Sequence, residues 1–192
     1  MFKIFNEKKI KNYFDENNQK FQKEIDNYSE REVLSLNVEL TAQNLFGEYK
    51  ITIPTFEGEN RQSKLITRKQ ITSRLSTETD TLVEIEMAYY NVPFIGEGNL
   101  FRCKPSRASS GLYQAEELLE NSITIQLTNE DIIIGYPESR EKIDAKFSGF
   151  VDYLKRNLNS LNNDVTEYNN GLFIVIKKYL DEKFNQVNKN KK

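Results

Sequence analysis

The stretch NVPFIGEGNLFRCKPSRASSGLY, residues 91–113, marks the point where strand-like sequence gives way to turns. It holds two of the four prolines, three of the eight glycines and the only cysteine. Glycine adopts backbone conformations that other residues avoid, and proline interrupts strand pairing. The stretch therefore predicts a turn over Pro93–Gly98, followed by a returning strand over Asn99–Lys104.

The same stretch contains a candidate anion site. The backbone N–H groups around Gly96 and Gly98 are able to form a concave nest for a phosphate, and Arg102, Lys104 and Arg107 follow within a few residues. Paired glycines in a hairpin turn also have a purely structural explanation. The sequence leaves both interpretations open and favours the structural turn.

Strand signals lie on both sides of this stretch. Apolar and polar residues alternate in several segments, as they do in half-buried strands. Strands are predicted over Glu32–Ala42, Glu48–Ile53, Thr81–Val92, Ser122–Leu127 and Ile132–Ile134, a strand is possible over Leu65–Leu75, and a short helix is predicted over Tyr113–Glu120. These segments predict a mostly antiparallel sheet of about six strands.

Helical spacing appears at both ends of the chain. Apolar residues between Asn6 and Tyr28 recur with a period that predicts an amphipathic helix. Beyond Ser139, a second apolar series alternates steps of three and four, as in a coiled-coil seam. The seam residues, predicted as an interface, are Val151, Leu154, Leu158, Leu161, Val165, Tyr168, Leu172, Val175 and Tyr179.

The seam is interrupted chemically at Asn162–Asp164, although its phase continues. Two interpretations follow: an antiparallel helical pair joined near Asn162, or one long helix reaching about Phe184. The pair is favoured, because a helix of that length would leave its seam exposed unless a partner covered it.

The predicted fold class is therefore α+β, within a single domain. The N-terminal helix occupies residues 1–30, the β-rich core residues 31–137 and the helical pair residues 138–188, and the lysine-rich tail 189–192 is expected to be disordered.

Composition narrows the function. The chain has 192 residues and a net charge of −2, so no global field attracts it to nucleic acid or membrane. Histidine is absent and Cys103 is the only cysteine, which excludes Ser-His-Asp triads, Cys-His pairs and zinc sites built from His or Cys. No cofactor or metal is predicted.

The first residues lack the apolar segment of a signal peptide, no stretch is apolar enough to span a membrane, and a cytoplasmic, bacterial protein is expected.

Three functional hypotheses remain. The first is a non-enzymatic interaction protein, a subunit or accessory factor of a bacterial complex, assembled with a protein partner or with itself through its helices. The alternative is a nucleotide- or nucleic-acid-binding module that uses loop 93–107. The third is a metal-dependent, nuclease-like hydrolase, in which Glu39, Glu48 and Lys50 match the E-x-K pattern of metal-dependent nucleases; the same residues also fit a solvated strand face.

Overall fold

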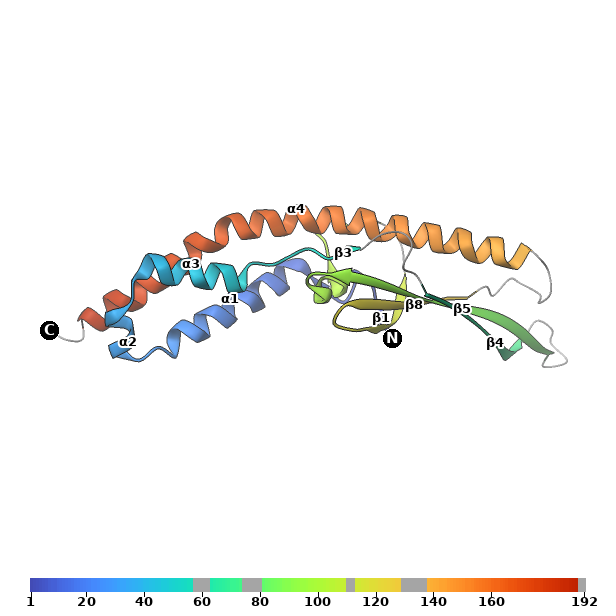
Figure 1. Ribbon diagram of the computed structural model, residues 1–192, viewed down its shortest axis with the longest axis horizontal. Helices are drawn as coiled ribbons and strands as arrows, with labels where there is room; N and C mark the ends of the chain where they lie inside the picture. Colours follow the sequence, from blue (N-terminus) through green and yellow to red (C-terminus); the bar gives the residue numbers. More distant parts are fainter. Residues whose placement is uncertain (57–62, 74–80, 110–112, 129–137, 190–192) are drawn as a thin grey trace.

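The computed structural model describes residues 1–56, 63–73, 81–109, 113–128 and 138–189. Figure 1 shows an elongated molecule in which one long helix runs along the whole length, with a sheet beneath one half and shorter helices beneath the other. In chain order the elements are β1 (Phe2–Lys3), β2 (Lys8–Lys9), α1 (Ile10–Asp26), α2 (Glu30–Ser35), α3 (Val38–Tyr49), β3 (Thr55–Phe56), β4 (Ser63–Ser73), β5 (Thr81–Ile95), the 3-10 helix η1 (Gly98–Arg102), β6 (Cys103–Lys104), β7 (Gln114–Leu118), β8 (Ser122–Thr128) and α4 (Glu138–Lys189).

The sheet confirms the predicted α+β class. Among the described residues, five strands pair antiparallel in the order β1-β7-β8-β5-β4, and the short β3 pairs with the C-terminal end of β5. A separate parallel pair joins β2 to β6. The predicted strands at Thr81–Val92 and Ser122–Leu127 are confirmed as β5 and β8, and β4 settles the ambiguous segment near Leu65 as a strand.

The two predicted strands between Glu32 and Ile53 are wrong. Their residues form α2 and α3, and side-chain caps explain the difference. Ser29 and Glu32 make a capping box, in which the Ser29 hydroxyl accepts from the Glu32 N–H and the Ser29 N–H donates to Glu32 Oε2. At the start of α3, Asn37 Oδ1 accepts from the N–H of Leu40. Such caps satisfy N–H groups that a helix start leaves unpaired.

Two further predictions near the central stretch are also wrong. The predicted helix over Tyr113–Glu120 is instead strand β7 (Gln114–Leu118), which lies between β1 and β8. The returning strand over Asn99–Lys104 is mostly the 3-10 helix η1, with pairing only at β6. The predicted strand Ile132–Ile134 and most of the predicted tail, residues 190–192, lie outside the described residues.

The C-terminal region is one helix, α4, and the favoured helical pair is wrong. The argument for a pair was that a long helix would expose its seam. The chain itself covers that seam, because the sheet packs on the N-terminal half of α4 and α1, α2 and α3 fold back onto the C-terminal half (Figure 1). Asn162 and Asn163 are exposed, and Leu161 and Val165 on either side carry the packing.

Two clusters of buried side chains form the interior. The sheet core is rich in aromatic rings, with Phe5, Phe101 and Tyr153 near its centre and Tyr90 of β5 stacked on Phe147 of α4. The helical core joins Phe21 and Ile25 of α1 and Ala42 and Leu45 of α3 to Leu172, Ile176 and Leu180 of α4. α1 contributes to both clusters and so ties the two halves together.

A polar junction lies between the two cores. The Asn169 side chain pairs with both backbone groups of Ile51, accepting from its N–H at 3.1 Å and donating to its carbonyl at 2.9 Å. Nearby, Asn17 Nδ2 donates to the Tyr168 hydroxyl at 3.0 Å, and the Phe14 ring stacks on Tyr168 with centroids 4.3 Å apart. The two Asn169 hydrogen bonds satisfy the backbone of Ile51, in the segment that follows α3.

Leu161 lies at the middle of the buried face of α4, and it is fully buried. We expect Leu161→Ala to lower the free energy of unfolding by about 3 kcal/mol, because it removes apolar contacts and leaves a cavity. Leu40→Ala, a matched change at a helical leucine that is 54% exposed, is expected to cost less than about 0.5 kcal/mol. Urea denaturation measures both, and equal losses would contradict the assigned burial.

Candidate functional site

The central loop, residues 93–107, contains the predicted ligand site, and its glycines have structural roles. Gly96 has φ = +114°, and a Cβ at this position would approach the carbonyl oxygen of Ile53 to 2.7 Å. A Cβ on Gly98 would lie 2.9 Å from the ring of Phe94. Both positions therefore need glycine for backbone conformation or close packing, without any ligand.

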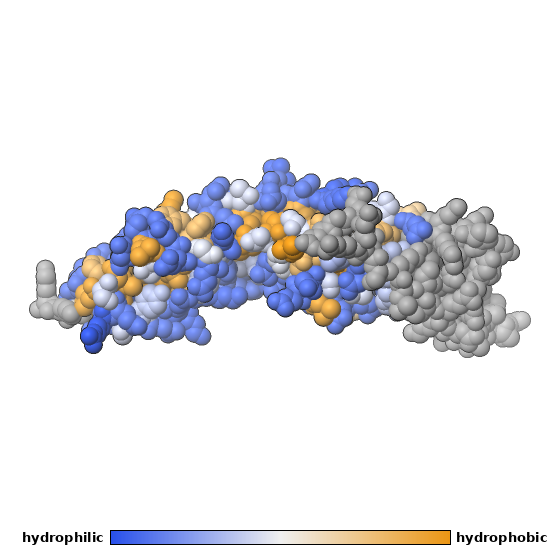
Figure 2. All heavy atoms as spheres, in the orientation of Figure 1, coloured by the Kyte–Doolittle hydropathy of each residue, from blue (hydrophilic) through white to orange (hydrophobic). Residues whose placement is uncertain are grey.

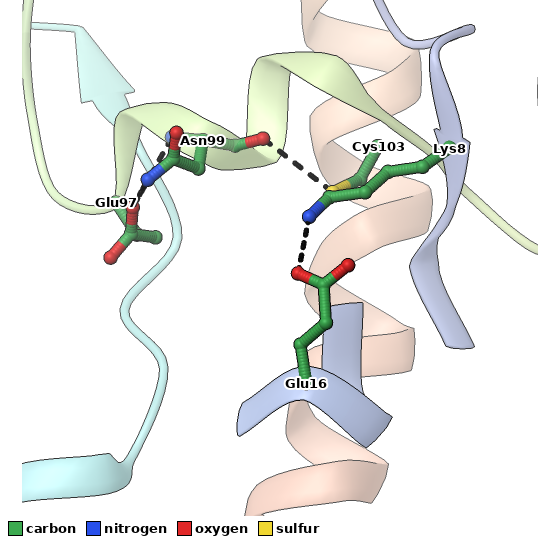
Figure 3. Close-up of polar contacts among 5 residues, drawn as sticks. All are labelled: Lys8, Glu16, Glu97, Asn99 and Cys103. Atoms are coloured by element: carbon green, nitrogen blue, oxygen red, sulfur yellow. Dashed lines mark hydrogen bonds and ion pairs between the residues drawn. The ribbon is translucent and has the colours of Figure 1, made fainter. Parts of the chain in front are cut away.

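Two N–H groups of the loop, those of Glu97 and Asn99, are paired with groups of the chain. Glu97 donates its N–H to the carbonyl of Thr52 at 3.0 Å. Its carboxylate accepts from the N–H of Asn99 at 3.2 Å and from Asn99 Nδ2 at 2.9 Å (Figure 3). A carboxylate thus occupies this turn, and it opposes a second anion there.

The three basic residues of the predicted site do not converge on the glycines. Arg102 pairs with Glu7 at 2.7 Å, and its guanidinium lies 4.3 Å from the centroid of the Phe2 ring. Gly96 and Gly98 line a surface hollow together with Leu118, Leu119 and Glu120, whereas Phe2 and Glu7 line a different hollow with Lys3 and Gln114. The predicted five-residue set is therefore divided between two places on the surface.

Lys104 and Arg107 are exposed, and the backbone between them is fixed to α4. The Ser106 N–H donates to Asp164 Oδ2 at 2.9 Å, and the Ser106 hydroxyl donates to the other carboxylate oxygen. Asn157, a buried polar residue of α4, likewise binds the backbone N–H and the hydroxyl of Ser109. Of the three basic residues in the nucleotide hypothesis, only Lys104 and Arg107 are exposed and without an ion pair in the described part of the chain.

Cys103 is a core residue. Its side chain is fully buried and donates weakly to the carbonyl of Asn99 at 3.5 Å (Figure 3). Burial raises the pKa of the Cys103 thiol to about 12, and the nearby Lys8 opposes this rise only in part. The Lys8 ammonium pairs instead with Glu16 at 2.6 Å and lies over the ring of Tyr13. The thiol is therefore protonated at neutral pH and has little nucleophilic character.

The hydrolase residues are not assembled. Glu39 and Glu48 lie on α3, where nine residues place them on opposite sides of the helix. Glu39 forms an ion pair with Lys177 of α4, and Lys50 is the residue that ends α3. No group of three or more acidic or cysteine side chains in the described ranges is arranged to hold a metal ion.

Most of the predicted interface seam packs inside the chain. Leu154, Leu158, Leu161 and Val165 lie in the sheet core and Leu172 in the helical core. Val151, Tyr168 and Tyr179 are partly buried against the same clusters. Val175 is different, since 44% of it is exposed.

Sequence reasoning missed the neighbour of Val175. Ile174 is 68% exposed, while Leu172 and Ile176 on either side are buried. Figure 2 shows apolar surface along the edge of the helical half of the molecule, where α4 runs over α3. The signal was present in the sequence, because residues 172–176 are five consecutive apolar residues and cover every side of a helix.

Comparison with known proteins gives no relative: no family model, curated protein or solved structure matches the chain. In the described residues, no helix is both long and apolar enough to cross a membrane.

Gly96 offers a direct test of the structural role of the loop. We expect Gly96→Ala to lower the free energy of unfolding by about 2 kcal/mol or more, because alanine is strained at positive φ and its Cβ meets the Ile53 carbonyl. Gly47→Ala is the control, since Gly47 lies within α3 with open space around it. There alanine is expected to raise stability by about 1 kcal/mol. A neutral Gly96→Ala, measured by the same urea denaturation, would contradict the assigned backbone conformation.

Proposed function

We propose that the protein is a non-enzymatic interaction protein, an accessory subunit of a bacterial cytoplasmic protein assembly. Its contact surface in this proposal is the outer face of the C-terminal half of α4, centred on Ile174 and Val175. The observation that carries the proposal is that two branched apolar side chains are exposed beside the buried Leu172 and Ile176.

The internal packing of α4 leaves this face unused. Leu172, Ile176 and Leu180, four residues apart, supply the contacts with α1 and α3. Polar residues at 174 and 175 would serve that packing equally well and would be better solvated. Covering an exposed isoleucine is worth about 2 kcal/mol, so this face gains stability when another protein surface packs on it.

The surroundings of the two residues fit a protein contact. Glu167 lies before them on the same helix, and Lys178 and Glu182 lie after them, joined by a long ion pair of 3.9 Å. An apolar centre with a charged rim is the usual composition of a protein interface.

The proposal is tested by isolating a tagged copy of the full chain from its native host, together with an untagged copy, and identifying what co-purifies by mass spectrometry. We expect a stoichiometric protein, either another chain or the untagged copy. Ile174→Glu should lower its recovery at least about tenfold, because a charge then lies at the apolar centre of the contact.

The control is Ile95→Glu, which changes another isoleucine that is 58% exposed and lies on β5. It should leave recovery unchanged. Recovery of the tagged chain alone, or undiminished recovery with Ile174→Glu, would overturn the proposal.

A further inference from the structure

A second regular strip of residues follows the outer face of α4. Its members recur in alternating steps of four and three: Ser160, Asp164, Glu167, Gly171, Ile174, Lys178 and Asp181. All are exposed or half-buried in the single chain. This spacing keeps the strip on one side of the helix, away from the buried Leu172 and Ile176.

We infer that the occupant of this strip is a second copy of the chain, with the two α4 helices antiparallel and the two-fold axis between Leu172 and Phe173. This inference rests on the proposed function and names its partner. In an antiparallel pair, residues equally far from the axis on either side lie level with one another. Ile174 then faces Gly171 of the second copy, and Lys178 faces Glu167.

The first of these pairings matches a projecting side chain to an open position. Ile174 is the most exposed apolar residue of α4 in its described part. Gly171 has no side chain, and a Cβ placed on it would meet nothing within 4 Å. A glycine inside a helix costs stability, and among the described residues no contact requires this one. A partner isoleucine that packs against the bare backbone supplies a reason for it.

The second pairing matches charges. Lys178 and Glu167 of the second copy lie level in this register, and the two-fold axis repeats the pair. Asp164 lies level with Asp181 of the second copy, and this pair carries like charges. Ser106 is hydrogen-bonded to Asp164, and the exposed Arg107 is the next residue along the chain.

A neighbouring register is less favourable. An axis through Ile174 would place Lys178 opposite Asn170 and Asp181 opposite Glu167, which loses the attractive pair and replaces the Asp164–Asp181 repulsion with a repulsion between Asp181 and Glu167. Only an axis between 172 and 173 gives both matches at once. It pairs the projecting Ile174 with the open position at Gly171, and the acidic Glu167 with the basic Lys178. This self-complementarity favours a second copy over an unrelated protein.

Sedimentation equilibrium of the purified full chain tests the inference. We expect a monomer–dimer equilibrium, and Glu167→Lys or Lys178→Glu alone should weaken it about tenfold, because each reversal makes two repulsive pairs per dimer. The double variant restores opposite charges and should return the dissociation constant to within about threefold of the original. Gly171→Leu should abolish the dimer while circular dichroism shows an intact helix.

Two results would contradict the inference that a second copy of the chain occupies the strip. One is a chain that stays monomeric up to about 1 mM, a concentration that would reveal even a weak dimer. The other is a double variant that does not recover from the loss caused by each single change. If the chain is monomeric but a different host protein still requires Ile174, the dimer fails and the proposed function stands. If nothing in the host requires Ile174, the proposed function fails as well.

Discussion

Burial of one face of α4 between Phe150 and Val187 is the constraint on which the rest of the structure depends. A helix of 52 residues spans about 78 Å, far more than one small core covers. Two different surfaces of the chain cover this face of α4: an aromatic sheet covers the N-terminal half, and α1, α2 and α3 cover the C-terminal half (Figure 1). The polar junction at Asn169 lies where the coverage changes from one to the other. The elongated shape follows from this arrangement.

The central loop also packs against the sheet and α4. Its glycines allow the turn to approach Ile53 and Phe94, and its buried cysteine packs in the sheet core. Ser106 in the loop and Ser109 just after it form hydrogen bonds with side chains of α4. The two glycines that suggested a phosphate site are thus explained by how this loop packs against neighbouring segments. The outer face of α4 has no such explanation within the chain, and this contrast directs the functional proposal to Ile174 and Val175.

Periodicity predicted the fold class, α1, β5 and β8, because these elements bury one regular face. It failed at Glu32–Ala42, where apolar residues at every second position from Leu34 to Leu40 imitate a strand, and the capping residues Ser29 and Asn37 were the better signal. It failed again at Val175. A strict repeat of 3.5 residues drifts relative to a helix of 3.6 residues per turn. Beyond Val165 the buried positions therefore move to Leu172, Ile176 and Leu180, and Val175 turns outward. The coverage of α4 by distant segments is a tertiary effect that no local pattern contains.

The central claim is that another protein chain covers the outer face of α4 in the cell. The most direct measurement places a photoreactive amino acid at position 174 of the full chain in its native host and determines the mass of any cross-linked product. The account predicts a product of twice the mass of the chain, formed with high yield from position 174 and not from a control position on β5 such as 95. The contradicting result is the absence of any cross-linked product when the photoreactive residue is at position 174. In that case the exposed face of α4 is not a contact surface.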